Sequence, residues 1–177
     1  MGCEYIDYGC GFAVKIASVD IVETPHGKIP LIDHRLLADK VCRCLAEKPT
    51  RLTGNEVRFL RLHFEMSLER FGDYFGVTHP AVKRWENKGD QCTQMNWSSE
   101  KCLRLLTLVR LGAAPTKITS LLLSLETRRP EGKHEIYITS GVAPSHRKQQ
   151  TLDRASAIRG KTTRQTAKRR PSSSMAR

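Results

Sequence analysis

The chain has 177 residues, enough for one domain of ordinary size or for a smaller domain with appendages. Its 30 lysines and arginines exceed its 18 acidic residues, giving a formal net charge of +12. The excess is concentrated in residues 141–177, which hold ten basic residues against one acid, Asp153. This distribution predicts a polyanionic partner, of which nucleic acid is the commonest.

Membrane-spanning and secreted classes are disfavoured by the same sequence. No apolar run approaches the roughly 20 residues that cross a bilayer. The N-terminus lacks the basic and long apolar regions of a secretory signal, and Ile6 stands where a myristoylation signal has Ser or Thr. Six cysteines without a tight framework indicate reduced thiols. We therefore expect a cytoplasmic protein with no membrane partner, which would associate with the nucleoid if its polyanionic partner is DNA.

Residues 1–47 are expected to form a small β-rich lobe followed by one helix. Valine and isoleucine recur over residues 12–32, and the Thr-Pro-His-Gly sequence at 24–27 signals a turn between two strands. Over residues 33–47 the apolar period changes to that of a helix, which a lysine–proline pair ends.

Three further helices are expected in residues 51–90. Thr53 and Glu56 form a capping box, in which each side chain satisfies a free amide at a helix start. Ser67 and Thr78 are suited to cap the two helices that follow.

The second and third of these helices have the pattern of a helix-turn-helix unit, each about nine residues long. Gly76-Val77-Thr78 forms the turn and Gly89 ends the unit. Gly72 lies inside a helix at a cost of about 1 kcal/mol relative to Ala, so we expect another helix to pass close to it. The predicted core of the unit is Phe71, Gly72, Phe75, Gly76, Val77, Val82 and Trp85.

A helix over about residues 98–111 is expected to turn Cys102, Leu105, Leu106 and Val109 inward, followed by a short helix over 116–125 and a strand over 135–139. The polar, basic tail cannot bury enough apolar surface to order itself. The resulting organisation is a β-rich lobe plus helix at 1–47, a helix-turn-helix domain at 51–126, a terminal strand within 127–140 and a disordered basic tail at 141–177. The fold class is mainly α.

The third helix of the unit, at about 79–88, has an apolar side and an outward basic side, as expected of a helix that lies in the major groove. The predicted base contacts are His79, Lys83 and Arg84. The predicted phosphate contacts are Ser67, Thr78, Asn87 and Lys88, together with Arg164, Lys168, Arg169 and Arg170 of the tail.

About 40 residues resemble the Xre/Cro-type helix-turn-helix family, whose pattern ends in Arg-Trp-Glu. The positions in register are Ser67, Phe71, Gly76, Val77, Arg84, Trp85 and Glu86. A wider resemblance is to MqsA/YgiT-type antitoxin-like regulators, which place a small β-rich domain before such a unit. It implies a dimeric repressor whose family arginine falls on Arg84.

Three features depart from these families. Leu68 replaces a glutamine that anchors on phosphate, and Pro80 replaces a residue that often reads a base. The zinc-binding Cys-x-x-Cys pairs are absent: the N-terminal spacings are Cys3-x6-Cys10 and Cys42-x-Cys44. Packed or idle thiols are favoured over structural zinc, so we expect no metal and no cofactor.

The sequence thus predicts a sequence-specific DNA-binding transcriptional regulator, a homodimeric repressor that acts on its own or a neighbouring operon. The dimer surface is expected on the helices over 98–125. The alternative is an antitoxin-like interaction protein whose lobe at 1–47 neutralises a toxin, with DNA binding as autoregulation. An enzyme is disfavoured because no carboxylate cluster, nucleophile arrangement or metal site is apparent.

Overall fold

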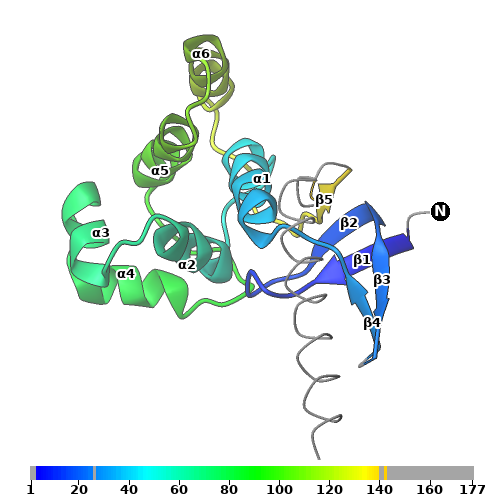
Figure 1. Ribbon diagram of the computed structural model, residues 1–177. Coiled ribbons are helices and arrows are strands. Elements are labelled where there is room, and N and C mark those ends of the chain that lie inside the picture. The colour runs from blue at the N-terminus through cyan, green and yellow to red at the C-terminus, as the bar shows by residue number, and fades with distance from the viewer. Residues whose placement is uncertain (1–2, 26, 140–141, 143–177) are drawn as a thin grey trace, which may run out of the picture. The chain divides into compact units, whose positions relative to one another are not determined.

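The computed structural model describes residues 3–25, 27–139 and 142. This part of the chain is mainly helical, with strands near its two ends (Figure 1). In chain order its elements are β1 (Cys3–Asp7), β2 (Val14–Val19), β3 (Ile21–Thr24), β4 (Gly27–Pro30), α1 (His34–Glu47), α2 (Gly54–His63), α3 (Leu68–Phe75), α4 (His79–Glu86), α5 (Trp97–Arg110), α6 (Pro115–Ser124) and β5 (Ile136–Ile138).

The strands form two separate sheets. β3 and β4 make the antiparallel hairpin that the turn signal at 24–27 predicts. β2 pairs with β1 on one side and, in parallel, with β5 on the other. The strand expected over 135–139 is therefore confirmed, whereas the sequence did not predict β1. An ion pair of 2.7 Å between Lys15 and Glu135 joins β2 to the residue before β5.

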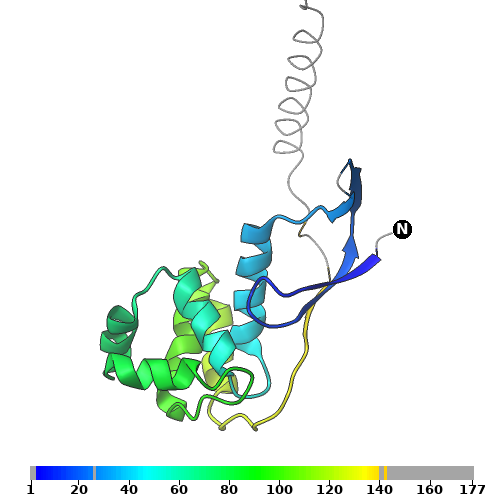
Figure 2. The same cartoon turned by 90° about the horizontal axis from the view of Figure 1, so that it is seen from below.

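Helix α1 lies between the strands and the remaining helices (Figures 1 and 2), in contact with β5 and with α2 and α5. One hydrophobic core joins Ile16 of β2, Leu45 of α1, Leu60 of α2, Phe71 of α3 and Val82 of α4. The strands and the helices therefore stabilise each other through shared burial of apolar surface.

The carboxylate of Glu100, on α5, is fully buried and binds two arginines. Its Oε2 accepts a hydrogen bond from Nε of Arg51 at 2.5 Å, and its Oε1 accepts one from Nη2 of Arg104 at 2.9 Å. Oε1 also accepts from the backbone amide of Leu52 at 3.1 Å. Burial of a charge is tolerated only when it is paired and hydrogen-bonded, and here both conditions are met.

Arg104 connects this carboxylate to the chain between α1 and α2. Its Nη1 donates to the carbonyl oxygens of Ala46 at 3.2 Å and Lys48 at 2.6 Å, and its Nη2 donates to that of Thr50 at 2.5 Å. Burial lowers the pKa of the Arg104 guanidinium, and Glu100 acts in the opposite direction. The side chain thus donates hydrogen bonds to carbonyl groups at and just after the end of α1, where a helix leaves its carbonyl groups unpaired.

The expected inward face of α5 is correct in part at Leu105, which is half-buried against Leu108 and Leu121, and is otherwise displaced. Cys102 and Val109 are exposed, and the fully buried side chains include Leu103 and Leu108 on the same face as the Glu100–Arg104 pair. The expectation assumed that charged side chains point outward. Because Glu100 and Arg104 neutralise each other inside the protein, the helix is turned by about one residue from the orientation that hydropathy alone favours.

Replacing Glu100 by alanine would leave Arg51 and Arg104 buried without their carboxylate. We expect Glu100→Ala to lower the free energy of unfolding by about 3–5 kcal/mol, the usual cost of breaking a buried pair. Urea unfolding followed by circular dichroism measures the change, with the exposed Glu126→Ala as the matched control. A loss below about 1 kcal/mol would contradict the role given to this carboxylate.

Candidate nucleic-acid interface

Helices α3 and α4 are eight residues each, joined by Gly76, Val77 and Thr78. The Ser67 hydroxyl caps α3 by accepting a hydrogen bond from the Arg70 amide at 3.1 Å. Gly76 ends α3 with φ +65°, a left-handed conformation that favours glycine. In Figure 1 the two helices run in clearly different directions.

Thr78 occupies the N-cap position of α4, but its hydroxyl makes no capping hydrogen bond. The expectation that it caps the helix is therefore only half correct. An N-cap side chain bonds the amide of the second or third helical residue, and the second residue here is Pro80, which has no N–H group.

Gly72 brings α3 close to the start of α4. A Cβ atom at this position would lie 2.5 Å from the carbonyl oxygen of Val77, nearer than real Cβ atoms approach. The predicted close approach is confirmed, but the neighbouring backbone is the turn before α4 rather than another helix. Any side chain at Gly72 would push the two helices apart.

The predicted core residues lie at different depths. Phe71, Gly72 and Val82 are fully buried, whereas Phe75, Val77 and Trp85 are half-buried against the same core. Gly76 is exposed and acts through its backbone conformation alone.

The end of α4 packs on the start of α2 through Gly54. A Cβ atom on Gly54 would lie 2.6 Å from the carbonyl oxygen of Trp85 and 2.7 Å from that of Glu86. Just beyond this contact, the Asn55 amide donates to the carbonyl oxygen of Gly89 at 2.9 Å. The absence of a side chain at Gly54 is what allows the two backbones to meet.

A two-point ion pair fixes α4 against the other end of α2. Nε and Nη2 of Arg61 donate to the two carboxylate oxygens of Glu86 at 2.6 and 3.1 Å. Nη1 of Arg61 donates to the Met66 carbonyl oxygen at 2.8 Å, so one guanidinium joins α2, α4 and the segment before α3. Paired hydrogen bonds of this kind set orientation as well as distance.

Sequence reasoning missed Gly54 and Arg61, and it used Glu86 only as part of a family pattern. The partners of the Arg61–Glu86 pair are 25 residues apart, so no helical spacing connects them. The only sequence signal was a glycine directly after the Thr53 cap, which is a poor helix residue and so indicates a close approach.

The opposite side of α4 is exposed and basic. His79, Lys83, Arg84 and Asn87 are all exposed. Within the described residues, no ion pair or hydrogen bond engages the side chains of Lys83, Arg84 or Lys88. Arg84, Asn87 and Lys88 share a cleft with Thr93 and Gln94 of the following loop, so the structure brings these predicted contacts together.

Ser67 is placed less favourably as a phosphate contact. Its hydroxyl already caps α3, and Glu69 lies in the same first turn. Hydrogen bonds from the backbone and from Ser67 lower the pKa of the Glu69 carboxyl, so this acid is ionised at neutral pH. A phosphate at this helix start would compete with that carboxylate. The four predicted tail contacts, Arg164, Lys168, Arg169 and Arg170, lie outside the described residues.

Among the described residues, no group of three or more His, Cys, Asp or Glu side chains could hold a metal ion. Burial, and to a lesser extent Asp7, raises the pKa of the Cys10 thiol to about 11. Burial also raises the pKa of Cys42 and Cys44. A raised pKa lowers the fraction of thiolate at neutral pH, and the thiolate is the form of cysteine that reacts with electrophiles.

No protein-family model, curated protein or solved structure matches this chain. None of the helices in the described part is both long enough and apolar enough to cross a lipid bilayer.

Gly72→Ala tests the contact that sets α3 against α4. In an unobstructed helix this change stabilises by up to about 1 kcal/mol. Here the methyl group must displace backbone, so we expect a loss of about 1–3 kcal/mol in the free energy of unfolding, measured in urea. Ser120→Ala on the exposed side of α6 is the control and should be neutral or slightly stabilising. A stabilised Gly72→Ala protein would contradict the close approach.

The cysteines should react with a thiol reagent in an order set by burial and pKa. At pH 8 the exposed Cys102 should be modified first, and the buried Cys42 only after denaturant is added. The rate at Cys10 should keep rising between pH 8 and about pH 11, because burial raises the pKa of this thiol to about 11 and its thiolate fraction grows throughout that range. Mass spectrometry of labelled peptides follows each site. Rapid labelling of Cys42 in the folded protein would contradict the burial of this side chain in the hydrophobic core.

Proposed function

We propose that the protein is a sequence-specific DNA-binding transcriptional regulator that inserts α4 into the major groove. The observation that carries this proposal is the division of α4 into two sides. Its inner side is fixed by Val82, Glu86 and Trp85, and its outer side presents Lys83 and Arg84 without partners among the described residues. A basic helix whose backbone is already fixed favours binding to a polyanion, since the helix itself needs no further ordering.

The side chains on α4 have distinct roles in this proposal. Arg84 donates two parallel hydrogen bonds to a guanine, and Lys83 and His79 reach neighbouring base edges. Asn87 and Lys88, beside the cleft at the end of the helix, bind phosphate. The Thr78 hydroxyl, which has no capping role, is left to bind phosphate, and the basic tail adds contacts that depend strongly on salt.

In this proposal the protein acts as a homodimeric repressor of its own or a neighbouring operon, and not as an enzyme. Val109, Leu122 and Leu123 leave exposed apolar surface on α5 and α6, which suits a dimer contact. A two-fold dimer would bind half-sites about 10 base pairs apart, or a multiple of that distance. Such a protein would work in the cytoplasm.

Arg84→Ala tests the assignment of the outer side of α4. Binding is measured by anisotropy on a duplex taken from upstream of the gene and on a scrambled duplex of the same composition. We expect the variant to lose about 5- to 150-fold in affinity for the upstream duplex and little for the scrambled one, as the loss of a bidentate base contact implies. Unchanged affinity for the upstream duplex would contradict the proposal.

Two further variants separate base contact from general charge. Lys88→Ala should weaken binding to both duplexes to a similar extent. It should also lower the slope of log affinity against log salt by about one. Arg128→Ala removes an exposed arginine outside α3 and α4, and it should change neither the affinity for the two duplexes nor the salt slope. Because the exposed Arg84 side chain makes no hydrogen bond or ion pair within the described residues, its variant should unfold at the wild-type urea concentration.

A second candidate function is toxin neutralisation through the N-terminal strands. The β3–β4 hairpin exposes Ile21, Val22 and Ile29, each more than 40% accessible, which favours contact with a protein. This candidate requires a small neighbouring reading frame whose product co-purifies with the wild-type protein but not with Val22→Asp. Co-purification that survives Val22→Asp, or the absence of such a frame, would count against it.

A further inference from the structure

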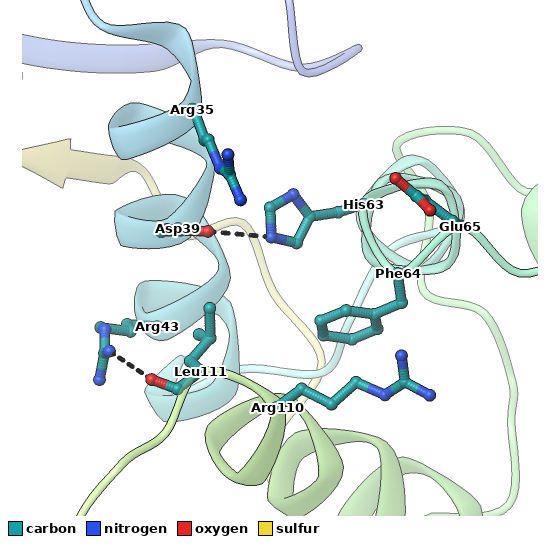
Figure 3. A pocket seen from close by; sticks show the side chains of 8 residues that line it. All are labelled: Arg35, Asp39, Arg43, His63, Phe64, Glu65, Arg110 and Leu111. Carbon is teal, nitrogen blue, oxygen red and sulfur yellow. Dashed lines mark hydrogen bonds and ion pairs between the residues drawn. The ribbon is translucent and has the colours of Figure 1, made fainter.

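A cavity of about 740 Å³ lies where α1 meets the ends of α2 and α5. Three arginines line it, Arg35 and Arg43 from α1 and Arg110 from α5, together with His63 and Phe64 from the end of α2 (Figure 3). Its size falls in the range that accommodates small ligands. The cavity contains none of the residues assigned to the DNA contact.

None of the three guanidinium groups forms an ion pair with a carboxylate in the described part of the chain. The Arg35 side chain makes no hydrogen bond there either, and Figure 3 shows it extending from α1 toward His63. Arg110 lies 5.2 Å from the centre of the Phe64 ring. Nη2 of Arg43 donates a hydrogen bond to the Leu111 carbonyl oxygen at 2.8 Å, which leaves the other nitrogens of this guanidinium available.

Two acidic residues line the same cavity but do not neutralise these arginines. Asp39 faces His63, with 3.1 Å between its Oδ1 and the imidazole Nε2 (Figure 3). Glu65 is exposed and follows Phe64 at the end of α2. The lining therefore holds an excess of positive charge next to an aromatic ring, and its guanidinium groups still have free donors.

We propose that this cavity binds a small organic anion through Arg35 and Arg110, with the apolar part of the ligand against Phe64 and Leu111. Guanidinium groups match the geometry of carboxylate and phosphate oxygens. A carboxylate and a phosphate can therefore each accept paired hydrogen bonds from these arginines. The inference goes beyond DNA binding and does not require it.

The position of the cavity connects it to α4. Phe64 and Glu65 directly precede Met66, whose carbonyl oxygen accepts a hydrogen bond from Arg61. Arg61 is the residue that holds Glu86 of α4. A bound anion would therefore touch the segment that positions the exposed basic helix.

The test is an NMR titration of the full-length, ¹⁵N-labelled protein with inorganic phosphate, pyrophosphate and succinate in separate arms. Sodium chloride at matched ionic strength is the reference for simple salt effects. We expect saturable shifts of the residue 35, 64 and 110 amides with at least one probe. The arm that binds most tightly shows whether phosphate or carboxylate is preferred.

Arg35→Gln and Arg110→Gln should each weaken the binding at least fivefold, and Arg128→Gln should leave it unchanged. The exposed Arg35 side chain makes no hydrogen bond or ion pair in the described part of the chain, so Arg35→Gln should keep the wild-type unfolding midpoint and, away from the substituted position, the wild-type spectrum. The absence of saturable shifts with all three probes, or equal weakening by Arg128→Gln, would overturn the inference. Duplex binding is measured separately, so its failure alongside intact anion binding would count only against the proposed function.

Discussion

The buried carboxylate of Glu100 is the constraint on which the remaining arrangement depends. It neutralises Arg51 and Arg104, and through Arg104 it fixes the carbonyl groups between α1 and α2. Because a buried, unpaired guanidinium is costly, these groups are satisfied only when α1, α5 and the start of α2 occupy their observed places. Apolar burial stabilises the core, and this network selects one arrangement of it.

Helix α2, placed by this network, in turn positions α4. Gly54 lets the backbones of the two helices touch, Arg61 holds Glu86, and Gly72 lets the turn before α4 lie on α3. Each of these contacts restricts the motion of α4 before binding, so a helix that binds in a groove would lose less conformational entropy on binding. The exposed basic side of α4 is thus the only side of that helix not committed to contacts within the described residues, which is the physical basis of the proposed function.

Local signals predicted much of this fold. The capping box at Thr53, the ends of α1, the β3–β4 turn and the close approach at Gly72 each follow from a few neighbouring residues. The orientation of α5 did not follow, because hydropathy treats Glu100 and Arg104 as surface residues. The parallel pairing of β2 with β5 and the Arg61–Glu86 pair join distant parts of the chain, and no periodicity in the sequence encodes such contacts.

The most direct measurement is selection of bound sequences from a random duplex pool by the full-length protein at two salt concentrations. We predict a motif with two related half-sites about one helical turn apart, which persists at the higher salt because base contacts from α4 define it. Enrichment that is uniform across sequences, or that disappears entirely as salt rises, would show that charge alone binds DNA and would contradict the account.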